Sequence, residues 1–216
     1  MQATIQTLNN PPKRKRRKEE RPREILEAAL ELFLARGYAA TRLEDVASLA
    51  GITKSSVYNY FPSKGQLFLS VIESNTQCQV DGALTIVKEH QGSMTSLIRI
   101  LLTTWWDSVL SKTTGGLLKI VISESAKFPA ITRFYLDSVI EPLQMILADV
   151  VRRGVASGEF RAIDAEAVSR VPLGNLLMLA LWRVTFGETS NTRDFAEDVN
   201  TTLDVCLRGL TPSAAS

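Results

Sequence analysis

Apolar residues recur at helical spacing along most of the chain, and the pattern is interrupted at glycines and prolines. The first such segment runs from about Pro22 to Arg36, and Gly37 follows it as a residue that favours a helix end. Further helices are predicted over residues 64–90, 93–112, 117–126, 129–156, 164–186 and 195–208. Pro142 and Pro172 fall inside two of these segments and predict kinks. No stretch alternates as a strand would over a useful length, so the pattern predicts an all-α protein.

Residues 41–64 predict two short helices joined by a glycine turn and followed by the start of a third helix. Gly51 lies just past the first of them, where glycine most easily adopts a left-handed conformation. The small or apolar residues that would pack this unit are Val46, Ala47, Ala50, Ile52 and Val57. The residues that would begin the helices are Thr41 with Glu44 as a capping box, Thr53 as a cap, and Ser63 with Gln66 as a second capping box. Such a helix-turn-helix is typical of proteins that read DNA.

The second short helix carries side chains that suit contact with DNA. They are Lys54, Ser55, Ser56, Tyr58, Asn59 and Tyr60, which offer hydrogen-bond donors and flat rings to phosphates and base edges. Residues 1–64 hold 12 Lys or Arg and 7 Asp or Glu, a net charge of +5, whereas residues 65–216 hold 13 and 16, a net charge of −3. This asymmetry is expected where one domain meets a polyanion and the other does not.

The run from Gly51 to Lys64, GITKSSVYNYFPSK, resembles the signature of the tetracycline-repressor (TetR) family of bacterial transcription regulators. The resemblance covers roughly residues 22–72, and a second stretch, ESAKFP over residues 124–129 with Phe134, Tyr135 and Pro142, is similar to the AcrR-like multidrug-responsive branch. The resemblance implies a three-helix DNA-binding domain over residues 21–66, preceded by a basic arm over residues 1–20. It also implies a helical domain over residues 67–216 that binds an effector and forms a dimer.

The resemblance assigns contacts with DNA to residues that match the family's motif. The residues at positions that grip the phosphate backbone are Thr41, Tyr58, Tyr60 and Lys64. The residues favoured for base edges are Arg42, Lys54, Ser55 and Ser56, and Thr53 and Asn59 complete the predicted DNA-binding set. Two alternatives stay open, namely that Tyr60 only packs against the first helix and that Lys64 is only a solvated charge.

The last two helices carry apolar stripes that suit a dimer interface. One stripe holds Leu173, Leu176, Leu177, Ala180 and Leu181, and the other holds Phe195, Val199, Leu203 and Leu207. In the TetR family these two helices form a four-helix interface, which would place two recognition helices about 34 Å apart on a palindromic operator. The alternative is that both stripes face the core of their own protomer.

The resemblance further implies a pocket within residues 65–187 for a small effector that releases the protein from DNA. The residues proposed for this pocket are Trp105, Phe134, Asn175 and Met178. Aromatic and methionine side chains favour a hydrophobic ligand that is planar or cationic. The alternative for each is a core position, with Asn175 as a hydrogen-bonded core amide.

The composition argues against catalysis and against a bound cofactor. His90 is the one histidine, and Cys78 and Cys206 lie in apolar helical patterns that predict buried thiols, so no metal site or other cofactor is expected. The chain has neither a nucleophile elbow nor a glycine-rich phosphate loop, so an enzyme is not expected. No apolar run approaches the length of a membrane span, and no apolar stretch follows the basic residues near the N-terminus as in a signal peptide, which favours a cytoplasmic protein.

Residues 1–20 contain a run of six basic residues at positions 13–18 and are predicted to be disordered. This arm either reaches phosphates or a minor groove, or is simply solvated. The sequence therefore predicts a ligand-responsive, dimeric DNA-binding repressor. The alternative class is a helical interaction protein, or a non-specific DNA binder that uses the basic arm.

Overall fold

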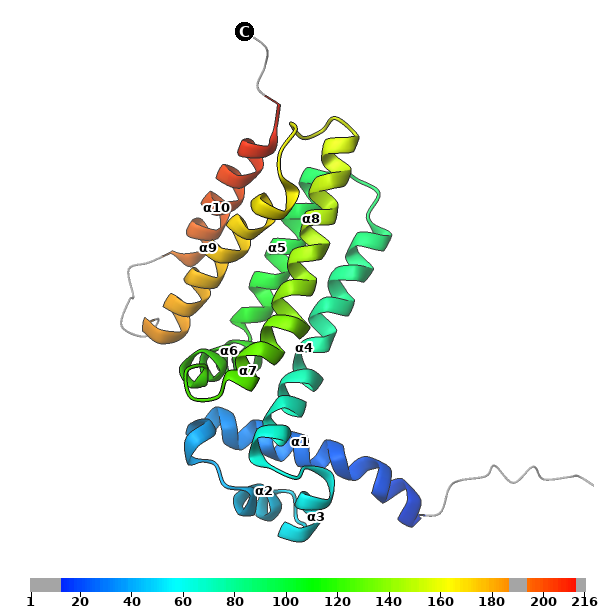
Figure 1. Ribbon diagram of the computed structural model, residues 1–216, viewed down its shortest axis with the longest axis vertical. Coiled ribbons are helices and arrows are strands. Elements are labelled where there is room, and N and C mark those ends of the chain that lie inside the picture. The colour runs from blue at the N-terminus through cyan, green and yellow to red at the C-terminus, as the bar shows by residue number, and fades with distance from the viewer. Residues whose placement is uncertain (1–12, 187–193, 213–216) are drawn as a thin grey trace, which may run out of the picture. The chain divides into compact units, whose positions relative to one another are not determined.

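The computed structural model describes residues 13–186 and 194–212, with side chains from Glu20 onward in the first of these ranges. Every regular element in these ranges is helical, which confirms the predicted all-α class (Figure 1). The elements are α1 (Lys13–Ala40), α2 (Leu43–Leu49), α3 (Lys54–Tyr60), α4 (Lys64–Glu89), α5 (Met94–Leu110), α6 (Lys112–Glu124), α7 (Pro129–Tyr135), the π-helical segment η1 (Leu136–Ile140), α8 (Glu141–Ala156), α9 (Ala165–Phe186) and α10 (Phe195–Leu210).

The chain divides into two compact units, residues 1–71 and residues 72–216. The first unit contains α1, α2, α3 and the beginning of α4, and the second contains the rest of α4 together with α5 to α10. Because the division falls inside α4, one continuous helix contributes to both units.

The first unit is built around an aromatic cluster. Phe33 of α1 and Phe68 of α4 meet edge to face with ring centroids 4.9 Å apart, and the Tyr38 ring lies 5.0 Å from that of Phe68. Val46 of α2 and Val57 of α3 are fully buried. Burial of one large apolar residue from each short helix stabilises the pair, because helices of seven residues are not stable alone.

The turn and two of the helix caps of this unit agree with the sequence pattern. Gly51 has a φ of +64°, a conformation in which a residue with a Cβ would be strained. Thr53 accepts a hydrogen bond from the Ser56 N–H at 3.3 Å at the start of α3. Ser63 accepts one from the Gln66 N–H at 3.2 Å at the start of α4. The turn and the starts of α3 and α4 are therefore formed by the residues that the sequence predicts.

The capping box predicted for Thr41 and Glu44 is wrong. Arg42 occupies the N-cap of α2 and makes no side-chain capping bond. Thr41 is buried, and its hydroxyl lies 2.8 Å from the carbonyl oxygen of Gly37, to which it donates. Gly37, with a φ of +78°, breaks α1 and exposes this carbonyl, so the threonine closes the end of one helix and does not begin the next.

Helix α1 begins earlier than the position of Pro22 suggests. It starts at Lys13, and Pro22 lies inside it. Lysine and arginine are good helix formers, and Pro22 removes one backbone hydrogen bond from a helix whose later turns the core stabilises. Of the arm predicted over residues 1–20, residues 1–12 lie outside the described part of the chain and residues 13–20 are helical.

The second unit is a bundle in which α8 packs on α9 and α5, and α9 packs on α10. Its fully buried side chains include Leu97, Leu117, Leu176 and Leu203, one from each of four helices. The break that the sequence suggests at Gly115 lies at Ser111 instead. Gly115 belongs to α6 because the absent side chain lets that helix approach the Val109 carbonyl oxygen, which would lie 2.6 Å from a Cβ at this position.

The helix predicted over residues 129–156 consists of α7, η1 and α8. The π-helical segment η1 precedes Pro142, which lies in the first turn of α8. A π-helical turn widens the helix and accommodates a proline that lacks the N–H group of a regular turn. Pro172 in α9 is buried within a helix that the structure describes as continuous.

Replacing Gly154 by alanine should destabilise the second unit by about 1–3 kcal/mol, the usual cost of overpacking. Gly154 lies in α8, and a Cβ at this position would overlap the ring of the buried Phe160. Thermal unfolding measures the change. The control is Gly82→Ala in α4, where no atom lies within 4 Å of the added Cβ, and the same substitution should be neutral or stabilising.

Candidate nucleic-acid interface and ligand cavity

Helix α3 presents most of its side chains to solvent. Val57 is its buried anchor, and Phe61 at its C-cap is buried as well. Lys54, Tyr58 and Asn59 are exposed, with 42% of Tyr58 accessible. A short helix that is held by one buried residue and a capped start therefore offers a polar, partly aromatic face of the kind that enters a DNA groove.

Lys54 is held in place by a neighbour from α2. Its ammonium group forms an ion pair with the Glu44 carboxylate and lies 5.7 Å from the centroid of the Tyr58 ring. The hydrogen bond from Lys54 holds the pKa of Glu44 below its usual range, and the same bond raises the pKa of Lys54. All three side chains are exposed, so the charge of Lys54 stays available to a phosphate or a guanine edge that displaces Glu44.

Three hydroxyl groups gather at the start of α3. The Thr53 oxygen lies 3.0 Å from the Ser55 hydroxyl and 2.8 Å from the Ser56 hydroxyl. Ser55 is exposed and Ser56 is half-buried. These small side chains leave room for the backbone to approach DNA, and they can donate to phosphate or base acceptors.

The remaining predicted contacts divide into two groups. Arg42 is exposed at the start of α2, and Tyr60 is half-buried at the end of α3. Thr41 is buried beneath the turn that follows α1. The Thr41 hydroxyl is therefore not presented to solvent, and we omit it from the proposed DNA contacts.

Lys64 makes contacts that sequence reasoning did not anticipate. Its ammonium group donates to the carbonyl oxygens of Tyr38 at 2.9 Å, Ala39 at 3.1 Å and Thr41 at 3.1 Å, and lies 4.5 Å from the centroid of the Tyr38 ring. An ammonium group has three protons, which match these three carbonyls. Lys64 therefore connects the first turn of α4 to the end of α1 and to Thr41 just after it, and it is not a merely solvated charge.

A Lys64→Met variant should lose about 1–2 kcal/mol of stability in the first unit, since it leaves three carbonyl oxygens without their charged donor. Partial exposure of the site keeps the loss at the lower end for charged hydrogen bonds. Chemical denaturation measures it, with Lys88→Met as the control because Lys88 is an exposed lysine at the other end of α4. A variant as stable as wild type but weaker in DNA binding would restore the phosphate contact as the main role of Lys64.

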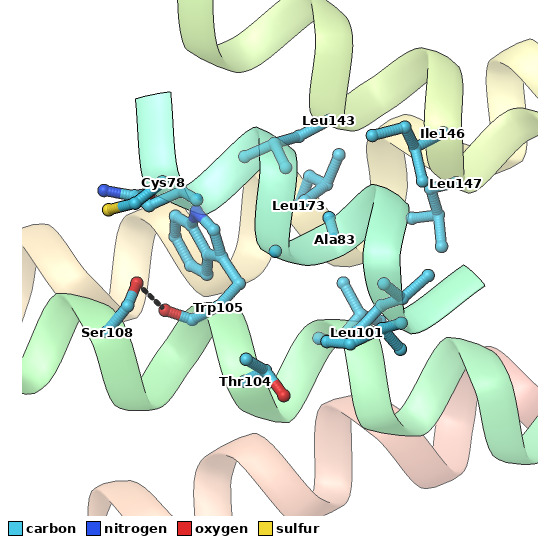
Figure 2. A pocket seen from close by; sticks show the side chains of 14 residues that line it. Cys78, Ala83, Leu101, Thr104, Trp105, Ser108, Leu143, Ile146, Leu147 and Leu173 are labelled. Carbon is cyan, nitrogen blue, oxygen red and sulfur yellow. Dashed lines mark hydrogen bonds between the residues drawn. The ribbon is translucent and has the colours of Figure 1, made fainter. Parts of the chain in front are cut away.

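The second unit contains an apolar cavity of about 190 Å³ between α4, α5, α8 and α9 (Figure 2). Its lining residues are Cys78, Gln79, Gly82, Ala83 and Ile86 of α4, Leu101, Leu102, Thr104, Trp105 and Ser108 of α5, Leu143, Ile146 and Leu147 of α8, and Leu173 of α9. An adjoining hollow of about 160 Å³ shares Trp105, Leu143 and Leu173 with it. The walls are predominantly apolar, as is usual for sites that bind small organic molecules.

The four residues predicted for a pocket fare differently in the structure. Trp105 lines the cavity, whereas Phe134, Asn175 and Met178 are not among the lining residues. Asn175 is exposed and donates a hydrogen bond to the Thr202 hydroxyl at 2.6 Å, which ties α9 to α10. Helical spacing identified apolar faces correctly, but it carries no signal that separates a filled face from one beside a void.

Gln79 is the lining residue with the least satisfied polar groups. Both its Oε1 and its Nε2 are buried, and neither has a hydrogen-bond partner among the described residues. Each buried polar group without a partner costs on the order of 1–3 kcal/mol. An amide retained at such a cost in an apolar wall is an uncommon feature of a protein interior.

The prediction of two buried thiols is wrong for one cysteine. Cys78 is exposed and borders the cavity. Cys206 is half-buried in α10, and burial raises the pKa of its thiol. Among the described helices, none combines the length and the apolar character that crossing a membrane requires.

The apolar stripes predicted for α9 and α10 lie mostly inside the protomer. Leu176, Ala180, Val199, Leu203 and Leu207 are all buried within its own core, as the alternative interpretation predicted. A different set of apolar residues is exposed on these helices. It comprises Val171 at 59%, Met178 at 57%, Trp182 at 41% and Phe186 at 50% on α9, and Val205 at 64% on α10.

Two family profiles match the chain. The profile of bacterial regulatory proteins of the tetR family matches residues 25–71. The profile of the tetracyclin repressor-like C-terminal domain matches residues 89–203. Together they cover the helix-turn-helix and most of the second unit.

Individual proteins resemble the chain in sequence or in fold. The HTH-type transcriptional regulator RutR of Escherichia coli (strain K12) is 43% identical over 60 residues, which are 28% of this chain and only 28% of RutR. A TetR-family transcriptional regulator from Mesorhizobium loti MAFF303099 has a TM-score of 0.75 at 22% identity, covering 91% of this chain and 99% of that chain. A transcriptional regulator from Saccharomonospora viridis in complex with choline has a TM-score of 0.74 at 22% identity, covering 90% and 99%.

Proposed function

This chain belongs to the TetR family of helix-turn-helix transcriptional regulators, and from that membership we propose that it is a ligand-responsive repressor. In this proposal it binds a palindromic DNA operator as a homodimer, and a small, largely apolar effector releases it. It acts in the cytoplasm, where the operator lies. The observation that carries the proposal is the exposed polar face of α3, held by Val57 and by the Thr53 cap.

The contacts with DNA are proposed for the exposed residues of α3 and its surroundings. Lys54 and Arg42 supply charge for phosphates or guanine edges, and Tyr58 supplies a hydroxyl on a stiff side chain. Ser55, Ser56, Asn59 and Tyr60 complete the contact surface, and Thr53 positions it through the cap. Lys64 supports this surface through its bonds to the end of α1 and to Thr41 before α2.

The exposed apolar face of α9 supports the homodimer. Val171, Met178 and Trp182 are spaced by seven and four residues, so they lie along one side of the helix, and Val205 extends the apolar surface onto α10. Exposed apolar patches of this kind mark interaction surfaces. A second copy of the chain would cover the patch and place two α3 helices for one palindrome.

Helix α4 supports a link between the cavity and the DNA-binding unit. Its first residue, Lys64, donates to the Tyr38 carbonyl oxygen at the end of α1, and residues 78–86 of the same helix form a wall of the cavity. A ligand that displaces α4 would therefore act on a helix that is hydrogen-bonded to the DNA-binding unit. Release further requires that the ligand bind the DNA-incompetent state more tightly than the competent one.

Selection of bound duplexes from a random DNA pool at physiological salt tests this function. The full chain and a variant lacking residues 1–20, which removes the basic run at positions 13–18, should both enrich the same palindrome. Equal binding of every duplex by the full chain, with that binding lost in the shortened variant, would favour a non-specific DNA binder that uses its basic arm. The selected duplex then serves as the probe for compounds that release the protein.

A Lys54→Ala variant should change the preferred base at one position of each half-site, with about a tenfold loss of affinity for the selected duplex, as is usual for loss of a base-edge contact. A Tyr58→Ala variant should instead weaken binding to all duplexes about equally, because phosphate contacts carry no sequence information. Competition binding with single-base variants of the duplex separates the two patterns. An unchanged base preference and affinity in Lys54→Ala would show that this lysine does not contact a base edge.

A further inference from the structure

Gln79 stands out among the polar groups that border the cavity. Its amide oxygen and nitrogen are buried and have no hydrogen-bond partner among the described residues. Two other polar groups of the wall have partners. The Ser108 hydroxyl donates to the Trp105 carbonyl oxygen at 2.7 Å (Figure 2), and the Cys78 thiol lies 3.6 Å from the Asn75 carbonyl oxygen. The amide of Gln79 is thus the buried polar group that a ligand in this cavity can satisfy.

The cavity wall favours an uncharged ligand. None of the described residues that line it is acidic, basic or a histidine, and its one exposed hydroxyl belongs to Thr104. An ion placed there would lose hydration without gaining a counter-charge. The cationic ligand that the sequence pattern also allows is therefore not supported, since no acidic residue is among the described residues of the wall.

The size of the cavity limits the ligand to a small ring system. Its volume is about 190 Å³, and a protein cavity of about 150 Å³ accommodates benzene. The ring of Trp105 forms part of one wall, and aliphatic side chains from α5 and α8 face it (Figure 2). A compound of one or two fused rings fits this space, and a flat ring can stack against the indole.

We infer that the side-chain amide of Gln79 anchors the effector through a pair of hydrogen bonds, in which Nε2 donates to a ligand carbonyl oxygen and Oε1 accepts from a ligand N–H. The ligand class is a small, neutral, planar compound with a cis amide group, such as a lactam fused to an aromatic ring. This inference rests on the proposed function, because it specifies the effector that the proposed repressor would recognise.

Ligands differ in which polar atoms of Gln79 they leave without a hydrogen bond. The amide of Gln79 is already desolvated. A ligand that supplies both an acceptor and a donor therefore gives hydrogen bonds to two buried atoms, Nε2 and Oε1, that otherwise have none. A ligand of the same shape without these groups gains only apolar contact. Gln79 forms part of the wall, and rotation about its side-chain bonds is required to aim the amide at the ligand.

Three bicyclic probes of similar shape test the pairing. Quinolin-2(1H)-one has both a carbonyl and an N–H, coumarin has the carbonyl alone, and naphthalene has neither. Calorimetric titration of the full-length protein should show about tenfold tighter binding of quinolin-2(1H)-one than of naphthalene, which corresponds to about 1.4 kcal/mol, with coumarin in between. A fourth probe, 2-naphthoate, tests whether Arg170 of the adjoining hollow anchors a carboxylate instead.

Two matched variants separate the role of Gln79 from a general effect on α4. Gln79→Leu should unfold at the same or a higher temperature than wild type, because it removes two unpaired buried groups, and it should lose the preference for quinolin-2(1H)-one. Gln77→Leu changes a glutamine of the same helix that is exposed and bonded to Asp81 at 3.1 Å, and it should keep the preference. Only Gln79→Leu should therefore lower the affinity for quinolin-2(1H)-one without lowering the unfolding temperature.

The outcomes distinguish this inference from the proposed function. A wild-type protein that binds its selected duplex but shows no preference for quinolin-2(1H)-one, that binds none of the probes, or that prefers 2-naphthoate, overturns the inference and leaves the DNA-binding function standing. Equal preference in wild type and Gln79→Leu overturns it as well. A preference lost only in Gln79→Leu, in a protein that selects no duplex, would support the ligand site and refute the repressor.

Discussion

A Met178→Glu variant should be monomeric and should bind the selected duplex about 100-fold more weakly than wild type, since an unpaired charge buried at an interface costs several kcal/mol. Met178 lies in the middle of the exposed apolar face of α9, between Val171 and Trp182. In a dimer built on this face the carboxylate would lose its hydration and find apolar neighbours. Each monomer would then hold one short recognition helix and reach only one half-site.

The control for this variant is Met145→Glu. Met145 is 70% exposed on α8 and lies outside the α9 face, so the same substitution should leave both the dimer and DNA binding intact. Sedimentation equilibrium measures the mass, and titration of a labelled duplex measures affinity. If Met178→Glu stays dimeric, the α9 face is not the interface, whatever happens to DNA binding.

The DNA-binding unit could be predicted well because its signals are local. Gly51, Thr53 and Val57 lie within seven residues of one another, and each acts through its own turn, cap or helix face. The same local reasoning failed for Thr41, whose hydroxyl bonds back to the end of α1. It also failed for Lys64, whose three acceptors lie 23 to 26 residues earlier in the chain. Contacts of that range are produced by folding and leave no periodic trace in the sequence.

The second unit could be predicted as helices but not as surfaces. Helical spacing marks the apolar faces of α9 and α10 without showing which of them a neighbouring helix covers. The sequence therefore predicts Leu176 and Leu203 at the interface, although both are buried in the protomer. For the same reason it predicts Met178 in the pocket, although this residue is exposed. The unpaired amide of Gln79 is a property of the packed structure and could not have been read from a glutamine in a polar part of α4.

Filling the cavity should remove the response to effector while preserving DNA binding. Ala83 is nearly buried in the α4 wall of the cavity, facing side chains from α5 and α8 (Figure 2). An Ala83→Phe side chain would occupy much of the space, and affinity for a compound that releases wild-type protein should fall by about 100-fold or more, comparable to the loss of several buried ring contacts. Filling a void commonly stabilises a protein by about 0.5–2 kcal/mol, so the variant should not unfold more easily.

The neighbouring substitution Leu84→Phe provides the control. Leu84 is 52% exposed on the same helix and does not line the cavity, so this variant should release DNA as wild type does. Release of the labelled duplex is titrated with the compound for both variants, and unfolding temperatures are compared. Ala83→Phe adds a ring inside the cavity, and Leu84→Phe adds one on the exposed surface. A difference in DNA release between the two variants therefore reports occupation of the cavity. If Ala83→Phe releases the duplex at the same compound concentration as wild type, the effector site lies elsewhere. That result would contradict the proposed link from the cavity through α4 to the DNA-binding unit.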